Sequence, residues 1–438
     1  MYGLVGRELR FALIISSAHF SQHVYYRILP PLIPVLAVAL EYPLWQLGLL
    51  ITLYSLGMGV VQAPLGILSD RYDRLYLLPS GIAITGLAYV LFAFAPTLGG
   101  SLEAVTLLGH TFEGGFLIMS LSMVGVGVGL SVVHPVGYPM ITDNVSIQHK
   151  GKVLGLFGAS SKLGDATAPA LIAGLILILP WHYIIQLFGF AGLVYGLALF
   201  IVLSRGPYVT IPSGQRERPL TEGRVKRHAY IYPMVVVYAF FITSGLATAG
   251  LNSFLPTFIV DVYEFSLGTG RFTIGPESVA NLYFALLLLS GAVMQLILGA
   301  IADQRDPRVI MIGCMVIATI GVAILATVGL NPVMLVVVIV ALGAGLYGVN
   351  PARDALISEL SPPEREGRTF GYVFTAVTLT AAPLPTVIGY LLDTVGMRTG
   401  FALLTIGPIL AGGTVCLLYS DRVYHTSNEA ATGVGPSD

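Results

Sequence analysis

Three side chains able to bind an anion or to carry a proton lie at regular intervals in the first apolar stretch. His19, His23 and Arg27 are four residues apart, so a helix would place them along one face. Charged residues are almost never buried unless they are paired, so this face must meet acidic partners or line a polar cavity. The Arg27 guanidinium can hold a carboxylate or phosphonate through two parallel hydrogen bonds, or it can pair with an acid such as Asp165. The pattern predicts that Arg27, His23, His19 and the adjacent Tyr26 help to bind a small anion.

A second polar group lies in another apolar stretch, where Lys162 and Asp165 are three residues apart. Two interpretations stay open: the pair is structural, or Lys162 binds the anion while Asp165 carries a proton. His134 precedes Pro135 in a third stretch, and histidine titrates near neutral pH. It can therefore relay protons, or it can bond to backbone that the proline leaves without a partner.

The second half of the chain offers milder polar candidates, of which Asn252 and Tyr283 are predicted to contact substrate. No deep charge there matches Arg27 or Lys162. We therefore expect the first half to bind the charged group and the second half to close over the remainder.

The composition shows what kind of protein must position these residues. The chain has 438 residues, of which 55% are hydrophobic and 10% are charged, and its mean hydropathy is +0.83. Soluble domains carry about 25% charged residues, so a soluble enzyme and a disordered chain are excluded. A net charge of −1 excludes a nucleic-acid binder. The two cysteines lie in apolar runs, which excludes a disulfide scaffold and a cysteine-rich metal site, and we expect no metal and no cofactor.

Long apolar runs predict an all-α membrane protein, since a helix needs about 20 apolar residues to cross a bilayer. Twelve runs are predicted to be spans, near residues 10–40, 45–69, 75–96, 115–142, 151–179, 182–203, 230–261, 278–302, 308–328, 332–359, 367–392 and 398–420. The basic residues favour a multi-pass protein of the plasma (inner) membrane with both termini in the cytoplasm. In that orientation, Arg271 and Arg398 are the only lysine or arginine residues on the outer side of the membrane. Arg27, Lys162 and Arg353 are the only ones within spans.

The chain is predicted to consist of two six-helix bundles. They cover residues 1–203 and 230–421, joined by a cytoplasmic linker at 204–229 and followed by a disordered tail at 422–438. Segment Gly66–Arg74 is repeated at Gly299–Arg308, and His134–Asp143 is repeated at Asn350–Glu359. Duplicated parallel halves indicate a transporter that rocks about a site between them.

These features resemble the major facilitator superfamily over essentially all of the spans. Gly66, Asp70, Arg71 and Arg74 match its cytoplasmic G-x-x-x-D-R-x-x-R motif, and the second copy has Gln304 in place of the first arginine. The stretches AHFSQHVYYRILPPLIPVL and GVGVGLSVVHPVGY resemble the fosmidomycin-resistance branch of drug and metabolite transporters.

The resemblance implies two pseudo-symmetric bundles and a gating role for the charged loop residues. The expected gating residues are Asp70, Arg71, Arg74, Asp303, Arg308 and Arg353. The alternative is a charge cluster that only sets topology at the membrane edge. One departure matters: the stretch GGFLIMSLSMVGVGVG lacks the arginine that proton-coupled members often carry, so proton coupling cannot be inherited from that motif.

The predicted function is secondary active transport of a small anionic or amphiphilic metabolite or drug, coupled to protons, by a monomer. The branch resemblance implies efflux. Proton-independent exchange of organic anions and a transporter-like sensor stay open as alternatives. The chain contains no HExxH, G-x-S-x-G or phosphate-loop motif, so an enzyme and an ATP-driven pump are not expected.

Overall fold

The computed structural model describes residue 4 and residues 6–212, 227–269, 272–302, 304–360 and 376–419. The middle of the predicted linker, the predicted tail and Asp303 lie outside these ranges.

The chain packs as two compact units. Unit 1 comprises Met1–Arg216 with Ser266–Ala285, and unit 2 comprises Glu217–Phe265 with Leu286–Asp438. The elements of unit 1 are α1 (Gly6–Tyr26), α2 (Leu29–Leu40), α3 (Leu44–Arg71), α4 (Arg74–Gly99), β1 (Val105–Leu107), β2 (His110–Phe112), α5 (Gly114–Leu130), α6 (Val133–Asn144), α7 (Ile147–Leu175), α8 (Trp181–Arg205), β3 (Leu267–Thr269), β4 (Phe272–Ile274) and the start of α10 (Pro276–Ala302). Unit 2 holds α9 (Arg227–Tyr263), the rest of α10, α11 (Pro307–Thr327), α12 (Pro332–Gly348), α13 (Asn350–Leu360), α15 (Leu384–Val395), α16 (Met397–Leu403) and α17 (Ile406–Leu417).

The predicted all-α membrane architecture is confirmed. Among the described residues, 11 helical segments are long and apolar enough to cross a membrane. Helix α7 is also long, with 29 residues, but polar residues such as Lys162 and Asp165 make it less apolar than the others. It corresponds to the predicted span at 151–179.

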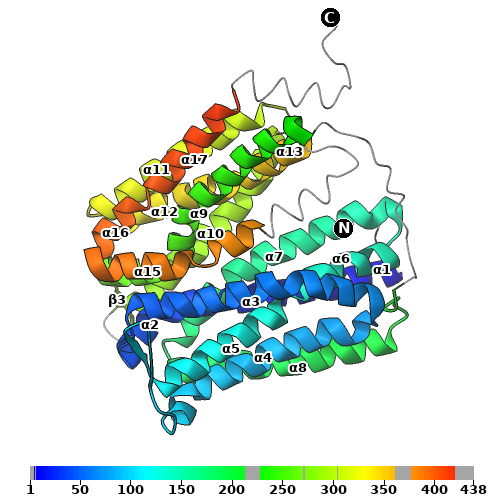
Figure 1. Cartoon of the computed structure of the whole chain (residues 1–438), viewed down its shortest axis with the longest axis horizontal. Coiled ribbons are helices and arrows are strands. Elements are labelled where there is room, and N and C mark those ends of the chain that lie inside the picture. The colour runs from blue at the N-terminus through cyan, green and yellow to red at the C-terminus, as the bar shows by residue number, and fades with distance from the viewer. Residues whose placement is uncertain are drawn as a thin grey trace, which may run out of the picture. The chain divides into compact units, whose positions relative to one another are not determined.

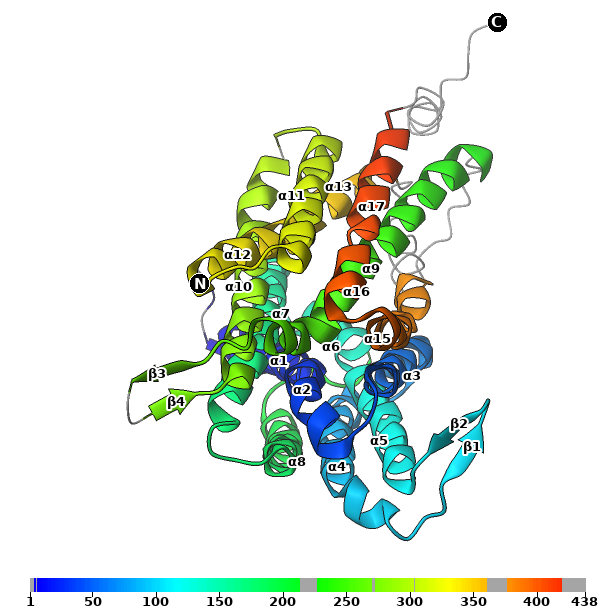
Figure 2. The ribbon, with the colours of Figure 1, turned by 90° about the vertical axis from the view of Figure 1, so that its left-hand side faces the viewer.

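Two short antiparallel hairpins accompany the helices, and the sequence analysis did not predict them. β1 pairs with β2, and β3 pairs with β4, each over three residue pairs. Figure 2 shows the β1–β2 hairpin between the end of α4 and the start of α5. Glycine at position 109 supplies the positive φ of +82° that the tight turn after Leu108 requires.

Several predicted spans are broken within their length. The stretch 10–40 divides into α1 and α2, with a tight turn in which the Ile28 amide bonds to the Tyr25 carbonyl at 3.4 Å. Prolines at the start of α2 lack an N–H group, so the helical hydrogen bonds are interrupted there. The Tyr25 carbonyl also accepts a 2.7 Å bond from the Tyr89 hydroxyl. A second break separates α5 from α6 just before His134.

Helices in unit 1 approach closely where glycines face each other. Helix α4 packs against both α5 and α8 (Figure 1). Helix α1 packs along α7. A Cβ atom on Gly86 would lie 2.6 Å from the Gly189 carbonyl oxygen of α8, so the small residue is required. In unit 2, α17 packs against α9 and α11.

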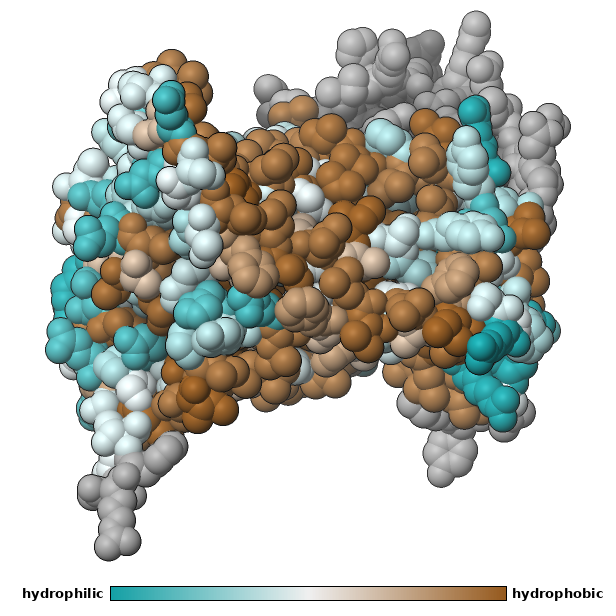
Figure 3. Space-filling view, turned by 90° about the horizontal axis from the view of Figure 1, so that it is seen from below, coloured by the Kyte–Doolittle hydropathy of each residue, from teal (hydrophilic) through white to brown (hydrophobic). Residues whose placement is uncertain are grey.

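The outer surface carries large exposed apolar side chains, as lipid contact requires. Val194 and Leu197 on α8 are 68% and 61% exposed. Figure 3 shows a broad hydrophobic band on one face, with hydrophilic residues gathered toward both ends of the view. Exposed apolar surface of this extent is typical of contact with a membrane.

Candidate functional site

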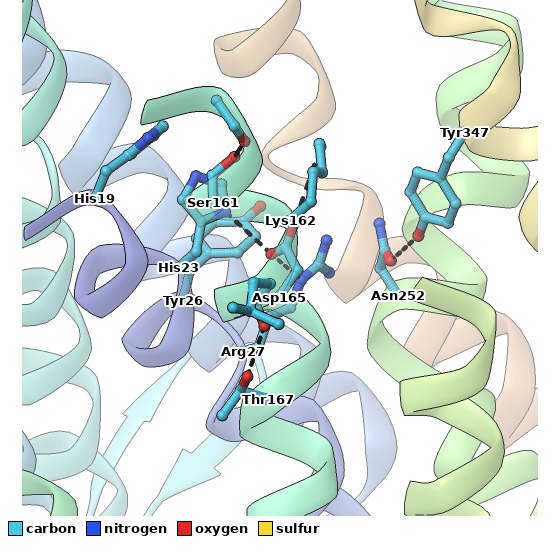
Figure 4. Close-up of polar contacts among 12 residues, drawn as sticks. His19, His23, Tyr26, Arg27, Ser161, Lys162, Asp165, Thr167, Asn252 and Tyr347 are labelled. Carbon is cyan, nitrogen blue, oxygen red and sulfur yellow. Dashed lines mark hydrogen bonds and ion pairs between the residues drawn. The ribbon is translucent and has the colours of Figure 1, made fainter. Parts of the chain in front are cut away.

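The Asp165 carboxylate lies at the centre of a cluster of basic side chains within unit 1 (Figure 4). Its Oδ1 atom is 2.9 Å from Arg27 Nε and 3.1 Å from His23 Nδ1, and its Oδ2 atom is 3.9 Å from Lys162 Nζ. The side chains of Asp165 and Arg27 are only 7% and 8% exposed, whereas Lys162 is 36% exposed. The pairing of Arg27 with Asp165, one of the two alternatives for Arg27, is therefore present, and Lys162 shares the same carboxylate.

Close packing of α1 on α7 brings this cluster together. A Cβ atom at Gly164 would lie 2.4 Å from the Phe20 carbonyl oxygen and 3.0 Å from His23 Cβ. Glycine beside Asp165 therefore lets the backbones approach until the α1 side chains reach the carboxylate. The four-residue spacing on α1 then places His23 and Arg27 on one side of it.

The helix break also contributes to the position of Arg27. It follows the last residue of α1, and its guanidinium lies over the Tyr26 ring at 5.1 Å from the centroid. The Tyr26 ring meets Tyr54 of α3 edge to face, with centroids 5.3 Å apart. An arginine on an aromatic face gains a cation–π attraction, which orients the side chain.

The other two histidines meet further along the same face of α1. His19 Nε2 is 3.1 Å from His134 Nε2, and His19 Nδ1 is 2.7 Å from the Phe157 carbonyl oxygen. The His19 ring also stacks on Phe157, with centroids 3.8 Å apart and planes inclined by 15°. Nearby, the Gln22 side chain donates to the Leu130 carbonyl at the break before α6. His134 therefore contacts another histidine rather than only the backbone near Pro135.

Polar candidates from the second half of the sequence fall in two places. In unit 2, Asn252 of α9 accepts a hydrogen bond from Tyr347 of α12. The sequence analysis did not single out Tyr347, although it lies just before the repeated Asn350–Pro351 segment. In unit 1, Tyr283 is buried at 8% exposure, and Asn281 donates to the Pro31 carbonyl at 3.2 Å. Asn252 therefore belongs to unit 2, whereas the Asp165 cluster belongs to unit 1.

The loop motif divides into exposed and buried members. Asp70 and Arg71 are exposed, and the side chain of neither forms a hydrogen bond or ion pair with another described residue. Arg74 is buried, with its guanidinium 2.6 Å from Asp143 at the end of α6 and its Nε donating to Ser69. Sequence reasoning missed Asp143 as a partner, because the two residues are far apart in the chain.

Two further predicted gating residues have partners in unit 2. Arg308 contacts Asp306 at 2.8 Å and donates to the Leu418 carbonyl at 3.0 Å. Hydrogen bonds from Arg308 hold the pKa of the Asp306 carboxyl below its usual value. Arg353 pairs with the adjacent Asp354 at 2.8 Å and lies over the Phe241 ring. Gating by these residues stays a prediction, and Asp303 lies outside the described residues.

Comparisons with known proteins identify the family. Residues 15–276 and 272–436 match the family model of the Major Facilitator Superfamily. A probable L-galactonate transporter of Escherichia coli K12 is 24% identical over 166 residues, which are 38% of this chain and 33% of that protein. The match thus spans about a third of that relative's length.

Two other matches cover nearly the whole chain. The uncharacterised MFS-type transporter YfnC of Bacillus subtilis 168 is 22% identical over 419 residues, 94% of this chain and 93% of that protein. The crystal structure of a bacterial homologue of the human lysosomal transporter Spinster, inward-facing and occupied, has a TM-score of 0.74 at 15% identity. That alignment covers 99% of this chain and 100% of the other, and it confirms the fold.

The family match extends along both halves of the chain and agrees with the repeated loop motif and the set of apolar helices. The chain belongs to the Major Facilitator Superfamily, and it is a multi-pass membrane transporter rather than an enzyme.

Proposed function

We propose that this transporter carries a small organic anion by alternating access, with Arg27 and Lys162 binding the charged group. The observation that supports this is the convergence of Arg27, His23 and Lys162 on the single carboxylate of Asp165. The same donors fit a substrate carboxylate or phosphonate, which would compete with Asp165 for them. The Asp165 carboxylate thus occupies the donors that would bind the substrate anion.

The surroundings of the cluster support a carbon-rich or amphiphilic anion. Tyr26 and Tyr54 place aromatic surface beside the Arg27 guanidinium. The partial match to a probable L-galactonate transporter agrees with a carboxylate substrate. Binding contacts from His19, Asn252 and Tyr283 stay predictions.

Replacing Arg27 tests the proposal directly. In proteoliposomes, Arg27→Ala is expected to abolish uptake of the transported anion, because the substrate loses its main charged partner. Labelled L-galactonate is the first probe, followed by other sugar acids, organic phosphates and phosphonates. The matched control is Arg10→Ala, which removes an exposed arginine from α1, the helix that Arg27 follows, and should leave uptake unchanged. Undiminished transport by Arg27→Ala would remove Arg27 from the site.

The substrate can be identified by a screen of ligand-dependent thermal stability. Organic anions and antimicrobial compounds are compared with neutral analogues of similar size. Stabilisation by anions that is lost in Arg27→Ala supports the proposal, whereas stabilisation only by neutral compounds contradicts it. Binding without measurable transport would favour the transporter-like sensor.

Two coupling modes stay open for this carrier. Proton coupling requires that an imposed pH gradient drives net movement of the anion, and exchange requires that movement is independent of the gradient. Comparing flux in vesicles with and without a pH gradient separates the two modes. Reversing the gradient then tests whether efflux, which the branch resemblance implies, is the favoured direction.

A further inference from the structure

Three imidazole rings gather in unit 1, and His23, one of them, also contacts Asp165. One ring nitrogen from each of His19, His23 and His134 lies within 4.8 Å of those of the other two. The closest pair, His19 Nε2 and His134 Nε2, is separated by 3.1 Å. Two nitrogens bound to one zinc ion at about 2.0–2.1 Å in tetrahedral geometry are about 3.3 Å apart, close to this separation.

Hydrogen bonds on the far side of two rings leave nitrogen lone pairs available. The Phe157 carbonyl can only accept a hydrogen bond, so its 2.7 Å contact places the proton of neutral His19 on Nδ1. His19 Nε2 then carries a lone pair directed at His134. Likewise, the Asp165 carboxylate accepts from His23 Nδ1 at 3.1 Å, which leaves a lone pair on the other ring nitrogen.

The same contacts are the ones that orient metal-binding histidines. A ligating imidazole almost always donates its second N–H to a carboxylate or a backbone carbonyl, and both kinds of partner are present. The His19 ring is buried and is held by stacking on Phe157, while His23 and His134 are half-buried. A four-residue spacing on one helix face can bring two imidazoles to one ion, and His19 and His23 of α1 have this spacing.

We propose that His19, His23 and His134 bind one late first-row divalent transition-metal ion, with Zn²⁺ as the probe. Imidazole nitrogen favours zinc, copper and nickel over magnesium and calcium, which prefer oxygen. Three protein ligands leave a fourth coordination position open to water or to an oxygen of an anion. This site goes beyond the proposed anion transport, because its binding is defined by the three imidazoles and can be measured without any substrate.

No metal site is expected from the sequence, because the two cysteines lie in apolar runs, but histidine ligands from separate helices are not covered by that reasoning. His134 is distant from His19 and His23 in the sequence, and only the break before α6 and the packing of α1 bring the rings together. The competing interpretation is a simple hydrogen bond between His19 and His134 in a site that binds no ion.

Metal content and affinity of the purified full-length chain test the proposal. The affinity tag is removed, the protein is treated with a chelator, and Zn²⁺ is titrated by calorimetry. We expect one Zn²⁺ per chain, an affinity at least tenfold weaker in His19→Ala and in His134→Ala, and X-ray absorption showing imidazole ligands. His110→Ala is the matched control, since it removes an exposed histidine from β2 and should not change the affinity.

A milder variant guards against loss of folding. His134→Asn keeps a polar side chain of smaller size, and its thermal stability without metal can be compared directly with that of the native chain. The proposal is supported if Zn²⁺ raises the unfolding temperature of the native chain and of His110→Ala but not of His134→Asn. The proposal is overturned if the native chain binds no Zn²⁺, or if His19→Ala, His134→Ala and His134→Asn bind Zn²⁺ as tightly as the native chain. It is also overturned if His110→Ala weakens Zn²⁺ binding as much as these variants do.

Discussion

The Asp165 carboxylate is almost fully buried, and its basic neighbours offset the desolvation penalty of its negative charge. Its closest partner, Arg27, is equally buried, and the 2.9 Å separation is that of a direct charge-assisted hydrogen bond. Two charges in this position stabilise the fold only as a pair, because each alone carries a large desolvation penalty. Removing either Arg27 or Asp165 alone is therefore expected to lower the stability of the folded protein as well as to affect the proposed transport.

Asp165→Ala is expected to destabilise the protein by about 3–5 kcal/mol, because the buried Arg27 guanidinium loses this carboxylate. Thermal unfolding in detergent, followed by tryptophan fluorescence or by loss of monodisperse protein, measures the change. The double variant Arg27→Met with Asp165→Leu removes both charges and should regain most of that stability while remaining inactive in transport. A single variant as stable as the native chain, or a double variant no more stable than the single, would contradict the paired-charge account.

At the residue level, spacing along the chain was sufficient to place His23 and Arg27 on one side of the first span, where both contact Asp165. Pairing of Arg27 with Asp165 was one of the two alternatives, and substrate binding by Arg27 stays a prediction. The meeting of His19 with His134, and of Arg74 with Asp143, could not be predicted. Those contacts depend on how separate helices pack, which composition and periodicity do not specify.

At the scale of elements, the contact between α1 and α7 depends on the absence of a side chain at position 164. Gly164→Ala would place a methyl group 2.4 Å from the Phe20 carbonyl, so the helices must separate. We expect a loss of about 1–3 kcal/mol in stability, as for other overpacked sites, together with loss of transport. Thermal unfolding and flux measurements check both effects.

The matched control lies on the same helix. Gly158 of α7 has no atom within 4 Å of an added Cβ, so Gly158→Ala should stabilise the helix by up to about 1 kcal/mol. Equal destabilisation by both substitutions would contradict the assignment of the Gly164→Ala effect to the contact between α7 and α1.

The start of α11 provides a pH-dependent contribution outside the spans. Asp306 caps this helix by accepting from the Arg308 amide at 2.9 Å, and Arg308 lowers the pKa of the Asp306 carboxyl from its model-compound value of 3.8. Because the folded-state pKa is depressed, the stabilisation is complete above the unfolded-state pKa. It is lost as the pH falls through the folded-state pKa.

Asp306→Asn should therefore have a lower unfolding temperature than the native chain near pH 7. The difference between the two unfolding temperatures should become smaller as the pH falls below about 4. Unfolding temperatures of both proteins measured from pH 7 to pH 3 provide the comparison. A constant difference across this range would show that the charge of Asp306 does not contribute.

Hydropathy predicted most element boundaries well. It predicted them poorly where a proline interrupts the helix inside an apolar run. The stretch 10–40 was predicted as one span because its residues are apolar throughout, yet Pro30 and Pro31 follow a tight turn after Tyr26. The hairpins at Val105–Phe112 and Leu267–Ile274 were missed because their strands are only three residues long. Such short strands carry too little alternation to be detected.

At the scale of the whole molecule, apolar length and the duplicated loop motif were sufficient to predict the family, which the family match confirms. Substrate and coupling do not follow from the same features, since members share the fold and differ in the side chains that bind the solute. The predicted orientation is likewise a statement about the whole chain, because it depends on the distribution of basic residues among all loops.

Both termini are expected to lie in the cytoplasm. A reporter that fluoresces only in the cytoplasm, fused to the C-terminus, should be active, and a phosphatase that requires export should be inactive there. The phosphatase inserted into the β1–β2 hairpin, after Gly109, should be active because that segment is predicted to lie outside. The opposite pattern of activities would reverse the orientation.

The break between α1 and α2 has a mechanical consequence. At this break, tyrosine hydroxyls donate hydrogen bonds to backbone carbonyls: Tyr89 donates to the Tyr25 carbonyl, and Tyr54 donates to the Tyr26 carbonyl. Hydroxyl groups rotate freely and follow an acceptor through a range of angles, whereas the amides of a continuous helix cannot. A change in the angle between α1 and α2 would therefore disturb fewer backbone hydrogen bonds at this turn than a bend in a continuous helix would.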